Sequence, residues 1–459
     1  MLPTVFLRRH ILPIGLLSLV LPTAGIGQAT VSHADFQILN STPRALQNPL
    51  SQLNEEQQAR FTRGRALFDQ LWVASPSLDT DIDGLGPTFN QSACSACHTR
   101  NGRGAPPDTD SERMRGMLVR LSLPGAEPNG TPIPHPVYGD QLQDNAILGV
   151  PAEGRARVTW IEHTETFADG ESITLRRPDL ILGDLAFGEP EQDLLLSPRV
   201  APSLVGMGLL DAVPDAFLEA LAQEPRPDGI SGRVNRVWNA QTGTESIGRF
   251  GWKANMPTLA QQTAGAFLGD MGLTSTLYPD ENCPEVQLDC IQKSSGETDV
   301  TEEQLRDVVF YQAALAVPAP GASDTGDVDI QQGRELFMQA GCQHCHIPEL
   351  QTGAAALPVL SNRAFSPYTD LLLHDMGEGL ADGRPDFLAS GSEWRTPPLW
   401  GLGLVPTVNE HNTLLHDGRA RGVMEAIMWH GGEAEPARAR VKAMTTQERE
   451  KLVHFIESL

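Results

Sequence analysis

Two Cys-x-x-Cys-His pentapeptides are the clearest chemical feature of this sequence. They are Cys94-Ser-Ala-Cys97-His98 and Cys342-Gln-His-Cys345-His346. This spacing lets two thiols form thioethers with one haem while the adjacent histidine binds the iron. A lone Cys-x-x-Cys is also typical of half a zinc site or a redox dithiol. Because the pentapeptide occurs twice in a chain that begins like an exported protein, we expect two covalently bound haem c groups, with His98 and His346 as axial ligands.

The helices expected around the pentapeptides repeat as well. Gly64-Arg-Ala-Leu-Phe68 precedes the first motif, and Gly333-Arg-Glu-Leu-Phe337 precedes the second. Segments 301–310 and 446–455 each begin with a capping threonine and continue with early acids and a later apolar stripe. The order helix, haem turn, ligand-bearing loop, closing helix therefore occurs twice, as in two cytochrome c units.

Residues 115–200 have a different pattern, in which alternating and β-branched stretches are separated by Pro, Gly and Asp. Such stretches are typical of strands. We therefore predict a mainly α protein with two cytochrome c-type haem domains, at 30–317 and 329–459. The first domain carries a small strand-rich insertion at about 115–200, and residues 318–328 form the linker.

The beginning of the chain predicts export. Arg8-Arg9-His10 supplies a positive segment, an apolar stretch from 11 to 26 follows, and Gly27 and Ala29 suit a signal peptidase. The stretch is too short and too broken by prolines to predict a membrane span in the mature chain, although a retained anchor is the alternative. We expect a signal peptide at 1–29 and a periplasmic protein.

Charge and cysteine content narrow the function further. The 459-residue chain has a formal net charge of −24, which argues against nucleic-acid binding and against adhesion to an anionic membrane. Four of the six cysteines belong to the pentapeptides. The remaining pair, Cys283 and Cys290, flanks a short acidic loop, so we expect a local disulfide in an oxidising compartment.

The sixth iron ligand decides whether a haem carries electrons or reacts, because an iron with an open face can bind a substrate. After the second pentapeptide the sequence offers five histidines: His374, His411, His416, His430 and His454. His416 lies in a turn-like His-Asp-Gly-Arg segment, and His430 ends the helical run that follows. After the first pentapeptide, Asn101-Gly-Arg103-Gly places an arginine either against a haem propionate or as a cap of the turn.

The segment 397–403, Pro-Pro-Leu-Trp-Gly-Leu-Gly, is followed by Leu-His416-Asp-Gly-Arg and a helix. This resembles the C-terminal haem region of the bacterial di-haem cytochrome c peroxidase and MauG superfamily, most closely its di-haem oxidoreductase branch, also labelled thiol oxidoreductase. The resemblance spans the mature chain and is sharpest at 84–104, 199–211, 249–272 and 394–434. In the peroxidases a ligand follows the His-Asp-Gly histidine by fourteen residues, which is His430 here. The peroxidases use methionine there and MauG uses tyrosine, so this chain departs from both. The resemblance implies that His430 is the sixth ligand, with His416 as the main competitor.

The resemblance also implies roles in the first half. Ala266, fourteen residues after Trp252, corresponds to the non-ligating position of the family's reactive haem. Gln262 matches a family glutamine, and Asp270 is the nearest carboxylate to the family's catalytic glutamate, although both its spacing and its identity differ. Peroxide cleavage needs a base to move a proton and a polar group to orient the oxygens. We expect Asp270 as the base, Gln262 as the orienting group and Trp252 as a bridge between the haems.

Simpler interpretations of the same residues stay open. Trp252 can be a buried core residue, and Asp270 can be a turn residue or a calcium ligand. Met207, Met256 and Met271 are each near enough in sequence to close the first haem as a sixth ligand.

Together, these features predict a peroxidase-like enzyme whose open N-terminal haem reacts with peroxide or another small oxidant. Its bis-histidine C-terminal haem would exchange electrons with a small redox protein. One alternative is a non-catalytic di-haem electron-transfer protein. The other is a MauG-like oxidation of an organic or protein substrate, which His430 favours because bis-histidine haems usually have low potentials. A thiol oxidoreductase finds no support, since no Cys-x-x-Cys is left free of haem.

Overall fold

The computed structural model describes Met1 and residues 36–190, 193–319 and 326–459. The predicted signal peptide, apart from Met1, and residues 320–325 of the predicted linker lie outside the described residues. The described residues from Phe36 to Leu459 belong to a single unit by their contacts.

Two helix pairs form the frame of the molecule. α1 (Glu55–Asp69) packs against α7 (Glu302–Ala313), and α8 (Val328–Ala340) packs against α12 (Thr446–Glu457). The predicted capping threonine of α7 is confirmed, because Thr301 forms a reciprocal capping box with Gln304. In α12 the cap is Thr445 rather than Thr446, since the box needs an acceptor three residues later and Glu448 provides it.

The repeated glycine has the same structural role in both pairs. A Cβ on Gly64 would lie 2.0 Å from the carbonyl oxygen of Asp307 in α7, and a Cβ on Gly333 would lie 2.1 Å from that of Lys451 in α12. No side chain fits at such distances, so glycine allows the two helix backbones to approach closely. The sequence repeat therefore corresponds to a repeated helix crossing.

The other α-helices lie in the chain segments that connect the two helices of each pair, and all of them except α5 are shorter than the helices of the pairs. They are α2 (Cys94–Cys97), α3 (Met207–Asp211), α4 (Asp215–Gln223), α5 (Leu259–Met271), α6 (Leu288–Lys293), α9 (Val405–Asn409), α10 (Val423–Met428) and α11 (Glu435–Lys442).

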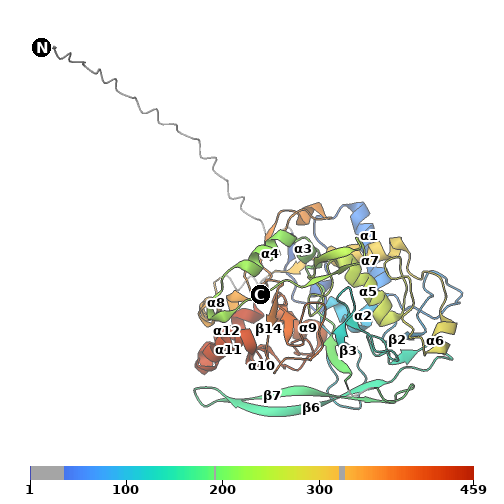
Figure 1. Ribbon diagram of the computed structural model, residues 1–459. Coiled ribbons are helices and arrows are strands. Elements are labelled where there is room, and N and C mark those ends of the chain that lie inside the picture. The colour runs from blue at the N-terminus through green and yellow to red at the C-terminus, as the bar shows by residue number, and fades with distance from the viewer. Residues whose placement is uncertain (2–35, 191–192, 320–325) are drawn as a thin grey trace. The chain divides into compact units, whose positions relative to one another are not determined.

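The strands form small separate sheets of two or three strands. They are β1 (Gln37–Ile38), β2 (Thr88–Phe89), β3 (Met117–Ala126), β4 (Pro132–Ile133), β5 (Asn145–Ala146), β6 (Arg155–Thr166), β7 (Ser172–Gly183), β8 (Leu195–Val200), β9 (Arg236–Asn239), β10 (Thr244–Ile247), β11 (Val317–Pro318), β12 (Leu350–Gln351), β13 (Ala364–Phe365), β14 (Leu373–Asp375) and β15 (Glu393–Arg395). The longest pair, β6 and β7, is an antiparallel hairpin in register from Arg155↔Gly183 to Thr166↔Ser172. Figure 1 shows this hairpin running beneath α10, α11 and α12.

The prediction of a mainly α fold is wrong. The structure is 31% helix and 20% strand, with many small sheets. The physical reason is that many connections between the helices form paired strands of only two or three residues. Strands this short produce no alternating pattern in the sequence.

The hairpin binds the second half of the chain through charged side chains. Glu165 near its tip accepts hydrogen bonds from Arg438 at 2.8 Å and from Lys442 at 3.0 Å. Arg449, which is 3% exposed, bonds Asp169 at 2.9 Å and lies over the Phe167 ring at 3.9 Å. The hairpin therefore connects the strand-rich region of the first half to α11 and α12.

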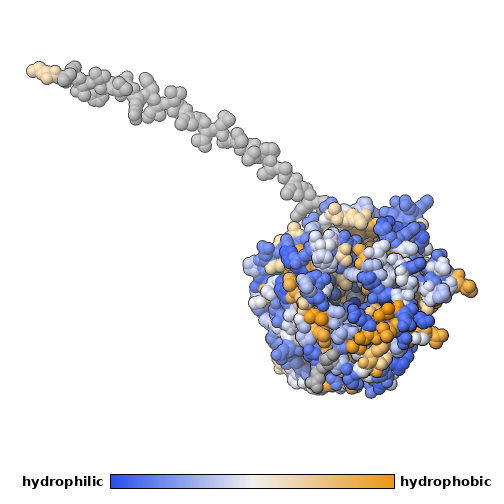
Figure 2. Space-filling model, turned by 45° about the vertical axis from the view of Figure 1, so that its right-hand side comes forward, coloured by the Kyte–Doolittle hydropathy of each residue, from blue (hydrophilic) through white to orange (hydrophobic). Residues whose placement is uncertain are grey.

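The surface in Figure 2 is mostly hydrophilic, with apolar side chains gathered in a patch at the lower right. Among the described residues, none of the helices has the length and apolar character that a membrane crossing requires.

Candidate active site

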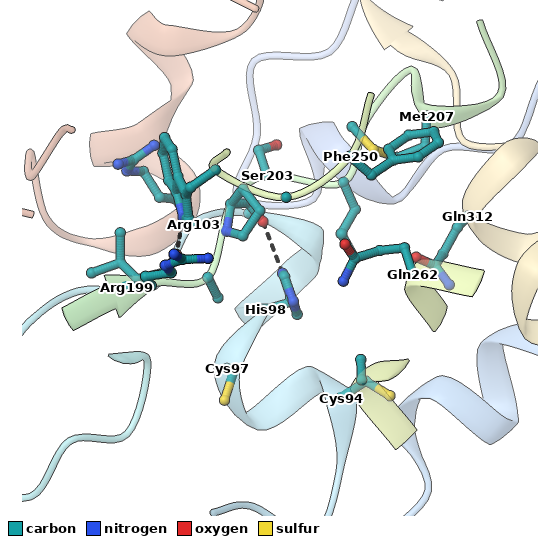
Figure 3. A pocket seen from close by; sticks show the side chains of 18 of the residues that line it. Cys94, Cys97, His98, Arg103, Arg199, Ser203, Met207, Phe250, Gln262 and Gln312 are labelled. Carbon is teal, nitrogen blue, oxygen red and sulfur yellow. Dashed lines mark hydrogen bonds between the residues drawn. The ribbon is translucent and has the colours of Figure 1, made fainter. Parts of the chain in front are cut away.

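The first pentapeptide faces a large cavity. Cys94 and Cys97 bound the short helix α2, and His98 follows it. His98 Nδ1 lies 2.8 Å from the carbonyl oxygen of Pro202 (Figure 3) and must donate to it. Burial lowers the pKa of His98 to about 4, so its ring is neutral. A neutral ring with Nδ1 protonated leaves the lone pair of Nε2 available to a metal.

The cavity has an atom-free space of ≈ 1900 Å³, part of which is open to solvent. Its lining brings together the site residues expected in the first half: Cys94, Cys97, His98, Trp252, Gln262, Ala266 and Asp270. Met207, Met256 and Met271 line the same cavity. Figure 3 shows His98 between Arg103 and Arg199 on one side and Gln262 and Gln312 on the other, with the two cysteines below.

Helix α5 presents three of these residues. Gln262, Ala266 and Asp270 are spaced four apart and therefore lie on one face of the helix. The helix starts at Thr258, whose side chain caps Gln261 N, and ends at Gly272, which has φ 64°. The small Ala266 lies between Gln262 and Asp270. On this face of α5, two polar side chains therefore flank a position that has only a methyl group.

Asp270 is held by the strand-rich region. Gln141 Nε2 donates to Asp270 Oδ1 at 2.9 Å, to Gly269 O at 2.8 Å and to Asn90 Oδ1 at 2.6 Å. Burial raises the pKa of Asp270, while the charge of Arg120 and the Gln141 hydrogen bond oppose this rise. A carboxyl group with a raised pKa accepts a proton more readily than an ordinary aspartate.

Trp252 connects the cavity to the second half of the chain. Its indole Nε1 donates to Val200 O at 2.8 Å, and its carbonyl accepts from Arg395 N at 2.9 Å. Val200 N in turn donates to His416 O at 2.8 Å. Trp252 is 7% exposed, so it is both a core residue and a wall of the cavity.

The arginines of the cavity test whether a haem fits there. Arg103 and Arg395 are buried and donate to backbone carbonyls, and neither forms an ion pair with a carboxylate among the described residues. Burial lowers the pKa of each to about 10. Arg199 Nη1 is paired with Asp386 at 3.1 Å, but the buried Nη2 of Arg199 lacks a hydrogen-bond partner within the described part of the chain. Buried cations of this kind are satisfied by an anion, and the propionates of a haem supply two carboxylates.

The second pentapeptide has the same local geometry. His346 Nδ1 donates to Tyr368 O at 2.9 Å, and burial lowers the pKa of His346 to about 4. The charges of His430 and His374 lower this pKa further, while that of Asp370 raises it. His430 Nδ1 donates to Ala426 O at 2.7 Å, one helical turn back at the end of α10. Both rings thus leave Nε2 available to iron.

The other later histidines are engaged differently. His374 has both ring nitrogens against carboxylates, at 2.8 and 2.9 Å. His411 Nε2 donates to Arg103 O at 3.0 Å, and its Nδ1 accepts from Thr413. His454 is exposed on α12. These contacts take up the nitrogens of His374 and His411.

His416, the main competitor of His430, packs as a core residue. Its ring stacks on Trp394 with centroids 3.6 Å apart and planes 13° apart. Its Nε2 lies 3.5 Å from Asp417 Oδ2, and burial lowers the pKa of His416 to about 4. The stack fixes the ring between the two halves of the chain.

Three residues that line the cavity were not found from the sequence: Arg199, Arg395 and Gln312. Gln141, which donates to Asp270 without lining the cavity, was not found either. Arg199 and Arg395 stand at the beginning of two of the stretches in which the family resemblance is sharpest, so a signal for them existed. Gln141 and Gln312 reach the site from segments without a motif, and only the fold brings them there. Gln312 Nε2 donates to Thr263 Oγ1 at 2.9 Å on the inner face of α5.

Cys283 and Cys290 form a disulfide with a Cα–Cα distance of 5.7 Å. Cys94, Cys97, Cys342 and Cys345 are not paired with one another. All four motif thiols are therefore available for thioether bonds.

Comparisons with known proteins agree with these features at the level of the family. The family described as "Di-haem oxidoreductase, putative peroxidase" matches residues 23–459. No curated protein is detectably similar in sequence to the chain. Among solved structures, a chain of Kuenenia stuttgartiensis hydrazine synthase, pressurised with 20 bar xenon, matches with 14% identity and a TM-score of 0.36. That match covers 99% of this chain and 100% of the other, but a TM-score this low carries no argument. Because the family match spans nearly the whole sequence, the chain belongs to the di-haem oxidoreductase family.

Proposed function

We propose that the chain is a periplasmic, peroxidase-like di-haem c-type oxidoreductase. Cys94 and Cys97 would attach the first haem, and Cys342 and Cys345 the second. His98 would bind the first iron and leave an open face. His346 and His430 would bind the second iron from both sides, so that the second haem relays electrons.

The contrast between Ala266 and His430 carries this proposal. His430 offers a neutral imidazole beside His346, whereas the corresponding position of the first half is an alanine in the wall of a cavity. The methyl group of alanine cannot bind iron. The two halves therefore differ in the property that separates a reactive haem from an electron carrier.

The residues of α5 would act on a peroxide in the cavity. A haem held by Cys94, Cys97 and His98 would supply the redox chemistry that cleaves the O–O bond. Asp270 would take the proton from the near oxygen and return it to the leaving oxygen. Gln262, two turns earlier on the same face, would donate its amide N–H to an oxygen and hold it in place. Gln141 keeps the Asp270 carboxyl oriented through its 2.9 Å hydrogen bond.

Arg103, Arg199 and Arg395 would hold the propionates of the first haem on the side of the cavity nearest the second half. Trp252 lines that side and contacts both halves, so it is the residue best situated to bridge the haems. A small redox protein would exchange electrons with the second haem. Export by the predicted signal peptide fits this assignment, because haem c is attached outside the cytoplasm. Calcium stays a prediction.

The test measures ligand binding and turnover on the purified holoprotein. Azide should bind to one haem per chain and leave the other spectrum unchanged. Reduced cytochrome c should then be oxidised when peroxide is added. Azide binding without turnover would favour a MauG-like oxidation of an organic or protein substrate.

The methionines favour a second candidate, a non-catalytic electron-transfer protein. Met207, Met256 and Met271 all line the cavity, and a thioether bound to the first iron would close it. In that case neither haem would bind azide, and peroxide would not be consumed.

A further inference from the structure

A buried histidine that the ligand assignment leaves unused lies beside the second pentapeptide. His374, in β14, is 2% exposed. Its Nε2 lies 2.9 Å from Asp370 Oδ2 and its Nδ1 lies 2.8 Å from Glu433 Oε2. A ring nitrogen forms a hydrogen bond with a carboxylate only as an N–H donor, so both nitrogens carry protons. The ring is therefore a cationic bridge between two carboxylates.

These carboxylates belong to the two segments that carry the axial histidine contacts. Asp370 lies two residues after Tyr368, whose carbonyl accepts the hydrogen bond of His346. Glu433 lies three residues after His430. His374 therefore joins the loop behind one axial imidazole to the segment that presents the other.

The loop behind His346 needs such support. Tyr368 and Leu371 have φ values of 54° and 60°, in the left-handed region that non-glycine residues seldom occupy. Residues held there persist when their surroundings determine the conformation. Asp370 supports this loop through both carboxylate oxygens. Its Oδ1 accepts a hydrogen bond from Leu372 N at 3.0 Å, and its Oδ2 accepts one from His374 Nε2.

The first half of the chain holds the same two carboxylates. Arg226 Nη1 lies 2.6 Å from Asp370 Oδ2 and 2.7 Å from the carbonyl of His344, inside the second pentapeptide. Ser231 donates its backbone N–H and its hydroxyl to Glu433, at 3.0 and 2.7 Å. Two cations thus balance one buried anion, Asp370, and one partly exposed anion, Glu433, and segment 226–231 contacts both sides of the bridge.

We propose that His374 is a positioning residue that fixes the relative orientation of the two axial imidazoles of the second haem. It does so by bridging Asp370 on the His346 side and Glu433 on the His430 side. The inference rests on the proposed ligation of iron by His430. Groups hydrogen-bonded to metal ligands or their supports change metal affinity and potential without touching the metal.

The experiment compares His374→Gln and Glu433→Gln with His454→Gln, a matched change at an exposed histidine whose side chain is 53% exposed. Glutamine at 374 reaches only one carboxylate at a time, and Glu433→Gln removes the charge on one side only. EPR and redox titration of the diferric holoprotein report on both haems. Both bridge variants should shift or split the low-spin g values of the second haem and shift its midpoint potential, with the first haem unchanged. The control should match the wild type.

Wild-type g values and potential in both bridge variants would overturn the proposal. If His374→Gln does not fold, as judged by circular dichroism and haem content, the partly exposed Glu433→Gln decides alone. A wild type without a bis-histidine signal would instead reject ligation by His430, and the inference with it. The wild-type EPR spectrum alone therefore shows whether ligation by His430 fails, and the variants then test the role of His374 separately.

Discussion

Three partly buried imidazoles share one hydrogen-bonding arrangement. His98, His346 and His430 each donate Nδ1–H to a backbone carbonyl, at 2.8, 2.9 and 2.7 Å. Backbone carbonyls accept only, so the protein fixes the tautomer of each ring and directs the Nε2 lone pair away from itself. These are the three histidines proposed to bind iron.

Replacing His430 by alanine should convert the second haem from low spin to high spin, because one of two axial imidazoles is lost. Resonance Raman spin-state bands of the diferric protein measure this conversion. His416→Ala is the control, since the His416 ring is stacked on Trp394 and has no place in the ligation. A spin change in the control but not in His430→Ala would show that the wrong histidine was chosen.

Replacing Asp270 by asparagine should slow the reaction with peroxide by about 10² to 10⁴, the usual loss when a general base is removed. Asparagine keeps an oxygen for the Gln141 hydrogen bond, so the packing of α5 and both haem spectra should persist. Stopped-flow mixing with peroxide gives the rate. Asp289→Asn, at an exposed position of α6, should react like the wild type. An unchanged rate in Asp270→Asn would make Asp270 structural.

For single residues, the sequence predicted the site positions that a motif or a fixed spacing identifies. The pentapeptides are recognised without knowledge of the fold. Gln262, Ala266 and Asp270 were indicated by the family resemblance, through their spacing from Trp252. Arg395 lies in a stretch that the resemblance marked, but its role and that of Gln141 could not be predicted, because they depend on which carbonyls and carboxyls surround the two side chains. A buried arginine indicates an anion-binding site only when the structure shows that it has no carboxylate partner nearby.

The elements that position these residues are the two helix pairs and α5. Each pair crosses at a glycine, and the crossing sets the distance between the haem turn and the closing helix. The capping boxes of α7 and α12 fix where the closing helices begin. The repeat of five residues in the sequence was therefore a reliable indication of a repeated crossing.

Replacing Gly333 by alanine should destabilise the protein by about 3 kcal/mol or more, since overpacking against a backbone cannot be relieved by a rotamer change. Its Cβ would lie 2.1 Å from Lys451 O. Gly183→Ala, where no atom lies within 4 Å of the added Cβ, should change the free energy of unfolding by less than about 1 kcal/mol. Urea unfolding followed by circular dichroism compares the two. Equal stabilities would contradict the close crossing.

The strands show where element prediction fails. Alternation in the sequence indicated strands at 117–123, 156–161 and 172–177, and β3, β6 and β7 are found there. The hairpin extends well beyond these stretches, because its distal part is anchored by Arg438, Lys442 and Arg449 rather than by an apolar face. Pairs such as β1 with β11 join residues far apart in the chain, which no local pattern predicts.

At the scale of the whole molecule, the two halves are joined by polar contacts around both sites. The Asp370–His374–Glu433 bridge lies in the second half and is held by Arg226 and Ser231 of the first half. Its ionisation should appear in the pH dependence of stability. Burial alone would raise the pKa of Asp370 and Glu433, but the adjacent cations lower both to about 2, from 3.8 and 4.5. Burial would lower the pKa of His374, but Asp370 and Glu433 raise it well above 6.5.

The carboxylates therefore contribute stability above their unfolded pKa values and lose it as the pH falls toward 2. His374 contributes stability that is complete below pH 6.5 and is lost as the pH rises through its folded pKa. The contribution of the bridge should be greatest between pH 4.5 and 6.5. Urea unfolding of the wild type and His374→Gln over this range should show a difference of about 3 kcal/mol at the maximum, typical of a broken buried ion pair. A difference independent of pH would contradict this ionisation.

The EPR spectrum of the diferric holoprotein as isolated tests the central claim most directly, because it reports the axial ligands of both irons at once. One open and one bis-histidine haem predict a high-spin signal and a low-spin signal that each integrate to one haem per chain. Two low-spin signals that persist after partial reduction would contradict the claim, since both irons would then be closed and the protein would be an electron carrier.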